Sequence, residues 1–152
     1  MDGNPLMRFL QVSYINALSA IAQNDNMVSV NSALQIDLTG QVCSESLGFR
    51  QYSGTGGATD FAYGAFHSKG GKGIIALTFN AKGGTVSRIQ PGLTYGSVVS
   101  ISRNIVDYVV TEYGIAKLRG KTVRQRVDEL ISMAHPNFRA QLRADANKYM
   151  IW

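Results

Sequence analysis

The sequence predicts a mixed α/β domain, because segments with strand-like and helix-like spacing of apolar residues follow one another along the chain. Residues 74–77 are a short aliphatic run and residues 106–111 are mostly β-branched, and both patterns are of the kind that form buried strands. Residues 123–134 instead keep apolar side chains at helical spacing, behind a T-x-x-Q capping box formed by Thr122 and Gln125. We therefore expect a sheet of about six strands with two C-terminal helices packed on it.

Length and composition favour one globular domain over residues 1–152. A chain of 152 residues with 45% hydrophobic content can build a proper core. No apolar run reaches the roughly 18 residues that cross a bilayer, and the first residues lack the pattern of a signal peptide. The single Cys43 excludes an internal disulfide, and no Cys/His set has zinc spacing. We expect a cytoplasmic protein with no metal and no membrane partner.

The first third of the chain carries a short helix and several strands. Residues 7–12 fit a strand, and Asn16 stands at the N-cap position before a helical run at 17–22. Alternation of apolar and polar residues then predicts strands at residues 27–31, 34–38 and 41–43, with a turn at 39–40.

Seven of the sixteen glycines fall within the stretch GTGGATDFAYGAFHSKGGKG. Glycine at this density is expected where backbone turns sharply or comes close to a ligand. We expect Gly54, Gly56 and Gly57 to form a loop, followed by a helix at residues 61–67 that Asp60 caps. A glycine loop that leads into a helix N-terminus presents backbone N–H groups to an anion or a developing oxyanion.

Several further strands are expected between this stretch and the last helices. The strand at 74–77 precedes a turn at 81–84 and a returning strand at 85–89, and 97–102 fits another strand. The strand at 106–111 ends at Glu112, which places a carboxylate at the end of a core strand, where α/β folds collect ligands.

Common sequence motifs for nucleotide and metal binding are not met. A Rossmann fingerprint needs glycine where Thr59 stands, and a P-loop needs glycine at Phe66 and a hydroxyl residue at Gly73. The two histidines, His67 and His135, lack acidic or cysteine partners at ligand spacing, so we interpret them as structural.

The net charge of +5 is concentrated near the C-terminus. This basic cluster fits a polyanion site or a solvated helix face, and both alternatives stay open. Only Tyr113 lies among these charges to stack on bases, so we expect no nucleic-acid partner. The members of the basic cluster are Lys117, Arg119, Lys121, Arg124 and Arg126.

Six separated stretches together resemble the C-terminal part of the acetyl-CoA hydrolase/transferase family, which includes 4-hydroxybutyrate CoA-transferase and succinyl-CoA:acetate CoA-transferase. Because these stretches keep their order and spacing over nearly the whole chain, the resemblance is far more specific than one glycine motif. The stretches are SYIN, AQNDNMVSVNSALQIDLTGQV, YSGTGGATDFAYGA, SRIQP, VDYVVTEYGIAKLRGKT and AHPNFR.

The resemblance implies the α/β fold of the class I CoA-transferase (NagB/RpiA/CoA-transferase-like) type, an open mixed-sheet sandwich. It also implies exchange of CoA between an acyl-CoA and a carboxylate such as acetate or 4-hydroxybutyrate. In that reaction a glutamate attacks the thioester, and an acyl-glutamyl anhydride and then a glutamyl-CoA thioester form. Each step passes through a tetrahedral oxyanion, which well-placed donors stabilise.

The resemblance also assigns roles to individual residues. The backbone N–H of Gly57 and the side-chain amide of Asn16 match donors to the oxyanion, and Glu112 matches an orienting or electrostatic carboxylate. The cofactor is coenzyme A, bound as the acyl-CoA substrate. Residues implied in its binding are Gly54, Gly56, Gly57, Lys72 and Lys82.

One departure from the family is the missing nucleophile, which lies in a segment N-terminal to everything in this sequence. Glu45 and Glu112 match other family positions, so neither is interpreted as the nucleophile. We expect a C-terminal domain that is inactive alone, pairs with its own N-terminal domain and forms a homodimer. An acetyl-CoA hydrolase and a non-catalytic CoA-binding or self-association module are the alternatives.

Overall fold

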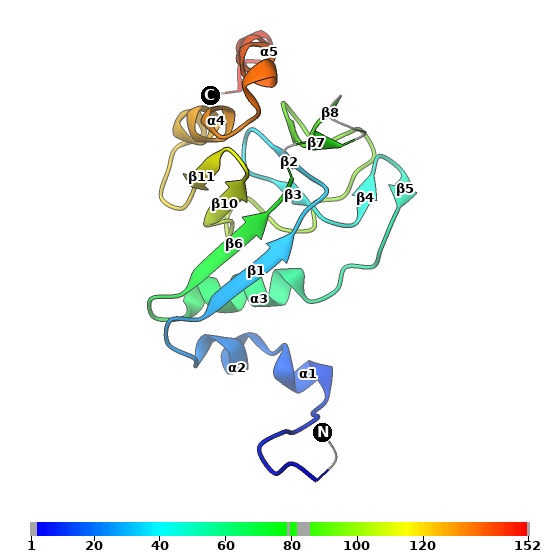
Figure 1. Cartoon of the computed structure of the whole chain (residues 1–152), viewed down its shortest axis with the longest axis vertical. Coiled ribbons are helices and arrows are strands. Elements are labelled where there is room, and N and C mark those ends of the chain that lie inside the picture. Colours follow the sequence, from blue (N-terminus) through cyan, green and yellow to red (C-terminus); the bar gives the residue numbers. More distant parts are fainter. Residues whose placement is uncertain (1–2, 79, 82–85, 152) are drawn as a thin grey trace.

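The computed structural model describes residues 3–78, 80–81 and 86–151 (Figure 1). In these ranges no helix is long and apolar enough to cross a membrane. The helices are α1 (Val12–Ile15), α2 (Leu18–Ala22), α3 (Ala58–His67), α4 (Val123–Ser132) and α5 (Pro136–Lys148). The strands are β1 (Val28–Ser32), β2 (Gln35–Asp37), β3 (Val42–Cys43), β4 (Ser46–Leu47), β5 (Arg50–Gln51), β6 (Lys72–Ala76), β7 (Asn80–Ala81), β8 (Val86–Ser87), β9 (Ile89–Gln90), β10 (Tyr108–Thr111) and β11 (Gly114–Lys117).

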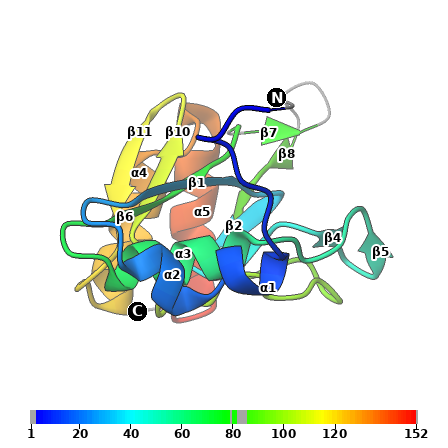
Figure 2. The same cartoon turned by 90° about the horizontal axis from the view of Figure 1, so that it is seen from below.

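The largest sheet has the strand order β1-β6-β10-β11. Strands β1, β6 and β10 are parallel, and β11 returns antiparallel to β10. Helix α3 packs against β1 and β6, and α2 packs on α3, so two helical layers lie on one side of β1 (Figures 1 and 2). Because only the residues 68–71 join α3 to β6, the helix runs antiparallel to the strand that it covers.

A second sheet, with the order β3-β2-β9, stands beyond the carboxyl ends of the parallel strands. It pairs β2 parallel with β9 and antiparallel with β3. The turn expected at residues 39–40 is confirmed, since Gly40 has a φ of +95° and the Asp37 carboxylate accepts bonds from Thr39 and Gln41. The core joins both sheets through fully buried side chains such as Ile36, Ile75 and Val109.

The expected sheet of about six strands is wrong in one respect, because the strands divide between two sheets and two short ribbons. Strand β6 lies between β1 and β10, so both of its edges are occupied and no returning strand can pair with it. The returning chain forms the ribbon β7-β8 and then β9 in the second sheet. Mixed α/β architecture with open sheets is confirmed, and the class I type stays a prediction.

Two predicted strands do not form. Residues 7–12 are irregular until α1 begins. Residues 97–102 make a single antiparallel bridge, between Ile101 and Val42. The side chains of Ser97 and Ser100 explain this, because they accept hydrogen bonds from the backbone of Gly48 and Ser44 and tie the segment to loops instead of a ladder.

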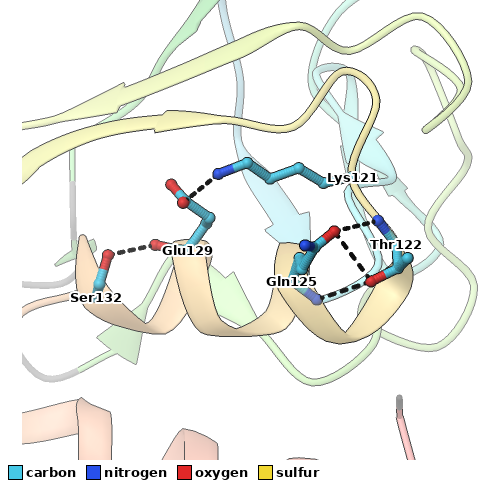
Figure 3. A network of polar contacts seen from close by, with 5 residues as sticks. All are labelled: Lys121, Thr122, Gln125, Glu129 and Ser132. Carbon is cyan, nitrogen blue, oxygen red and sulfur yellow. Dashed lines mark hydrogen bonds and ion pairs between the residues drawn. The ribbon is translucent and has the colours of Figure 1, made fainter.

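The two C-terminal helices are confirmed. Helix α4 packs beside β11, and α5 packs on α4 (Figure 1). The capping box forms as expected, because the Thr122 hydroxyl accepts from the Gln125 N–H at 3.3 Å and the Gln125 side chain accepts from the Thr122 N–H at 2.9 Å (Figure 3). His135 is the N-cap of α5, where its Nδ1 accepts from the Asn137 N–H, which confirms its structural role.

We predict that Thr122→Ala lowers the free energy of unfolding by about 1 kcal/mol, because the Gln125 N–H in the first turn of α4 loses its acceptor, the Thr122 hydroxyl. Urea unfolding followed by circular dichroism measures the change. Thr122→Ser keeps the hydroxyl and is the matched control. Equal losses in both variants would show that the hydroxyl does not support α4.

Candidate functional site

The candidate site begins where the glycine loop enters α3. The helix starts at Ala58 with Gly57 as N-cap, three residues earlier than expected, so the prediction that Asp60 caps it is wrong. Asp60 lies in the first turn, where its negative charge favours the helix dipole. No side chain of the described residues caps α3, and Gly56 turns the preceding loop with a φ of +56°. The first-turn N–H groups of α3 therefore face the loop without a side-chain cap.

Asn16 lies directly against this helix start. Its Nδ2 donates to Asp60 Oδ2 at 3.1 Å, and a Cβ on Gly57 would lie only 2.7 Å from the same nitrogen. The prediction that Asn16 caps the following helix is wrong, because α2 begins at Leu18 with Ala17 as N-cap and Asn16 ends α1. The two residues predicted as oxyanion donors, Asn16 and Gly57, are therefore neighbours.

A partly buried chain of hydrogen bonds holds the first turn of α3. The Thr59 hydroxyl donates to the backbone oxygen of Ser100 at 2.6 Å, and the Ser100 hydroxyl donates to Glu45 Oε1 at 3.1 Å. Glu45 is 6% exposed and also accepts from Gln51 Nε2. Glu45 thus connects the loop after β3 to the start of α3, a structural role that its sequence position did not reveal.

Glu112 lies at a second part of the site. It follows the last residue of β10, as predicted, and lines an open pocket of about 620 Å³ at the carboxyl ends of β1, β6 and β10. Arg88 lines the same pocket, and its Nη1 donates to the backbone oxygen of Leu34 at 3.2 Å. Sequence reasoning assigned no role to Arg88, although the residue belongs to the matched SRIQP stretch.

The two parts of the site lie toward the same end of the large sheet, where the parallel strands finish. Since α3 runs antiparallel to β6, its N-terminus with Gly57 lies toward the carboxyl ends of the parallel strands, where Glu112 is found. Lys72 is the first residue of β6 and so lies at the opposite end of the strand, about 13 Å from Ala76 at its carboxyl end. Its predicted contact with coenzyme A stays a prediction.

The other predicted coenzyme A residues lie in the loop or outside the described residues. Gly54 and Gly56 are exposed in the loop, and no described atom would lie within 4 Å of a Cβ on either. Lys82 lies outside the described residues. In the described part of the chain no group of three His, Cys, Asp or Glu side chains is placed to hold a metal ion.

A family model, described as acetyl-CoA hydrolase/transferase C-terminal domain, matches residues 1–146. The chain belongs to this family. Among curated relatives, the 4-hydroxybutyrate coenzyme A transferase of Clostridium kluyveri is 54% identical over 148 residues, which are 97% of this domain and 34% of that protein. This C-terminal domain therefore spans about a third of the length of such relatives.

Solved structures agree with the family assignment of the domain. RipA from Yersinia pestis matches it with a TM-score of 0.86 and 45% identity, over 93% of the domain and 32% of that chain. The 4-hydroxybutyrate CoA-transferase from Porphyromonas gingivalis matches with a TM-score of 0.78 and 44% identity, over 97% of the domain and 33% of that chain.

The basic cluster of the C-terminal domain is used largely within the fold. Arg119 lies 3.8 Å over the ring of Phe66, and Lys121 forms an ion pair with Glu129 (Figure 3). Arg126 Nη1 donates to the backbone oxygen of Arg103 at 2.6 Å. Burial lowers the pKa of the Arg126 guanidinium, and the charge of Arg103 lowers it further. The cluster is therefore not a continuous solvated helix face.

Asp107 is a buried carboxylate immediately before strand β10 of the large sheet. It is 4% exposed, and its Oδ1 has no hydrogen-bond partner among the described residues. Burial raises the pKa of the Asp107 carboxyl above its ordinary value, against the opposing charges of Arg119 and Lys117. Ionised Asp107 is therefore a cost to folding.

We predict a pH-dependent effect of Asp107→Asn on stability. With its pKa raised, the folded state binds this proton more tightly than the unfolded chain, so the stability contributed by Asp107 falls as the pH rises from about 4 toward the raised pKa. The variant lacks this dependence. Its unfolding free energy minus that of the unchanged protein should therefore increase across that window and then level off. Urea unfolding between pH 4 and 7 measures the difference, and a constant difference would contradict the shift.

Proposed function

We propose that this chain supplies the oxyanion-binding part of a CoA-transferase, which exchanges CoA between an acyl-CoA and a small carboxylate. The observation that carries the proposal is the packing of the Asn16 amide on Gly57 at the start of α3. The names of the relatives support this reaction class, and their greater length is consistent with a preceding region that carries the nucleophile.

In the first step of the proposed reaction, negative charge develops on the thioester oxygen, next to Asn16 and Gly57. A glutamate carboxylate of the N-terminal region attacks the thioester carbonyl, whose oxygen becomes an oxyanion. Asn16 Nδ2 carries two hydrogens, and Asp60 accepts one of them, so the second can be donated to that oxygen. The backbone N–H of Gly57 is the other donor, and each such donor contributes on the order of 10²- to 10³-fold in rate.

The intermediates then collapse and re-form in sequence. The C–S bond breaks, which releases the CoA thiolate and forms an acyl-glutamyl anhydride. The thiolate attacks the glutamyl carbonyl, which releases the first carboxylate and leaves a glutamyl-CoA thioester. A second carboxylate attacks this thioester, and the same steps in reverse deliver the new acyl-CoA. Every carbonyl attack passes through an oxyanion, so the same donors serve each one.

Glu112 is assigned an orienting or electrostatic role. It lines the pocket at the carboxyl ends of the parallel strands, where open α/β sheets bind ligands. As an acceptor of hydrogen bonds, the Glu112 carboxylate can orient donor groups of the substrate without attacking the thioester.

We predict that the isolated chain does not exchange CoA between acetyl-CoA and butyrate, because the attacking carboxylate lies outside it. A chimera that places this chain behind the N-terminal two-thirds of the Clostridium kluyveri relative should carry out the exchange. Chromatography of acyl-CoA products measures both. Exchange by the isolated chain would overturn the location of the nucleophile.

We predict that Gly57→Ala in this chimera lowers kcat on the order of 10²- to 10³-fold, with a much smaller effect on KM. The added methyl would lie 2.7 Å from Asn16 Nδ2 and displace the amide from the helix start. Gly92→Ala is the matched control, since its methyl would meet no described atom within 4 Å and the residue lies outside the glycine loop. Equal activity of the two variants would remove Gly57 and Asn16 from the oxyanion site.

Hydrolysis is the second candidate, because the family description includes acetyl-CoA hydrolases. Water then resolves the glutamyl-CoA thioester in place of the second carboxylate. The chimera distinguishes the two outcomes, since a transferase releases free CoA slowly without an acceptor and a hydrolase releases it at full rate.

A further inference from the structure

The large sheet buries only one of its two faces. On the side of α3, the residues Ser29, Ile75, Val109 and Ala116 are buried. The strand register places the intervening side chains in rows on the other face, and all of them are exposed or half-buried. These rows are Val28 and Lys72; Val30, Ile74, Tyr108 and Lys117; and Ser32, Ala76, Val110 and Ile115. We call this surface the open face.

The open face is apolar although it is exposed. Ile115 is 69% exposed, Val30 64% and Val28 51%. Sheets built on parallel strands are normally covered on both faces, and contiguous exposed apolar side chains mark interaction surfaces. Within the described residues α3 covers one face of β1 and β6, and no helix packs against the other (Figure 2).

The open face continues into the pocket that contains Glu112. Ser32, Ala76 and Val110 belong both to the open face and to the pocket lining. Of its two lysines, Lys72 lies in the row farthest from Glu112 and Lys117 lies in the middle row. A protein region that packs on the apolar rows would therefore also cover the open side of the pocket.

We propose that the open face is the docking surface for the N-terminal region that this family carries ahead of its C-terminal domain. The inference rests on the proposed function. Its occupant follows from length, because this chain spans about a third of its relatives and matches their C-terminal domain. The docked region bears apolar side chains over Val30 and Ile115 and acidic groups near Lys72 and Lys117. Docking closes the pocket over Glu112.

Thiol labelling in the chimera described above tests this docking. Ile115→Cys and Val30→Cys each place a thiol on the open face, and Tyr149→Cys, at a position 57% exposed at the end of α5, is the matched control. The native Cys43 is buried. Mass spectrometry of the labelled peptides gives the rate at each site. Because all three positions are exposed, melting followed by circular dichroism should show unchanged folding.

In the chain alone, all three thiols should react at similar rates. In the chimera, the Ile115→Cys and Val30→Cys thiols should react at least tenfold more slowly, while the Tyr149→Cys thiol keeps its rate. Unchanged labelling of the open face in a chimera that exchanges CoA would overturn the docking site. Protection that rises with concentration in the chain alone would assign the face to a second copy and overturn the proposed occupant.

The exchange assay separates failure of the two proposals. A chimera with a protected open face but no exchange activity supports docking and contradicts the transferase assignment. A chimera with exchange activity and an unprotected open face supports the transferase assignment and contradicts docking.

Discussion

The close approach of α3 to α2 is the contact on which the candidate site depends. Gly64 makes this approach possible, because a Cβ there would lie 2.2 Å from Ile21 Cγ2. Since Asn16 precedes α2 and Gly57 begins α3, the packing of these two helices brings Asn16 onto Gly57. A bulkier residue at position 64 would separate the helices and with them Asn16 and Gly57.

The site is assembled at an edge where several elements end. Helix α3 begins there, strands β1, β6 and β10 end there, and the buried Glu45 ties the neighbouring loops to the start of α3. Backbone N–H groups and carbonyls that lack partners within an element are available at such an edge. The candidate site is therefore formed by the ends of elements, while the core formed by residues such as Ile75 and Val109 keeps those ends in place.

The pocket at this edge is open, and its open side adjoins the uncovered face of the sheet. Both features have one physical cause, which is that parallel strands require a layer on each face and the described chain provides only one. Family membership gives this a simple meaning. The relatives that it matches are about three times as long, and under the proposed docking one further region would cover both the apolar face and the open side of the pocket.

The sequence by itself determined the features that depend on neighbours along the chain. The capping box of α4, the turn at Gly40 and the strand before Glu112 need only local spacing and local hydrogen bonds. The glycine loop was also found from composition, and its assignment to an oxyanion came from the family resemblance and not from spacing.

Only the tertiary structure decided which groups meet across the chain. Residues 97–102 have the pattern of a strand, but Ser97 and Ser100 bind loops instead. Asp60 has the pattern of a helix cap, but α3 starts earlier and leaves its carboxylate to Asn16. In each case a polar side chain had a local and a distant partner available, and packing of the whole domain selected the distant one.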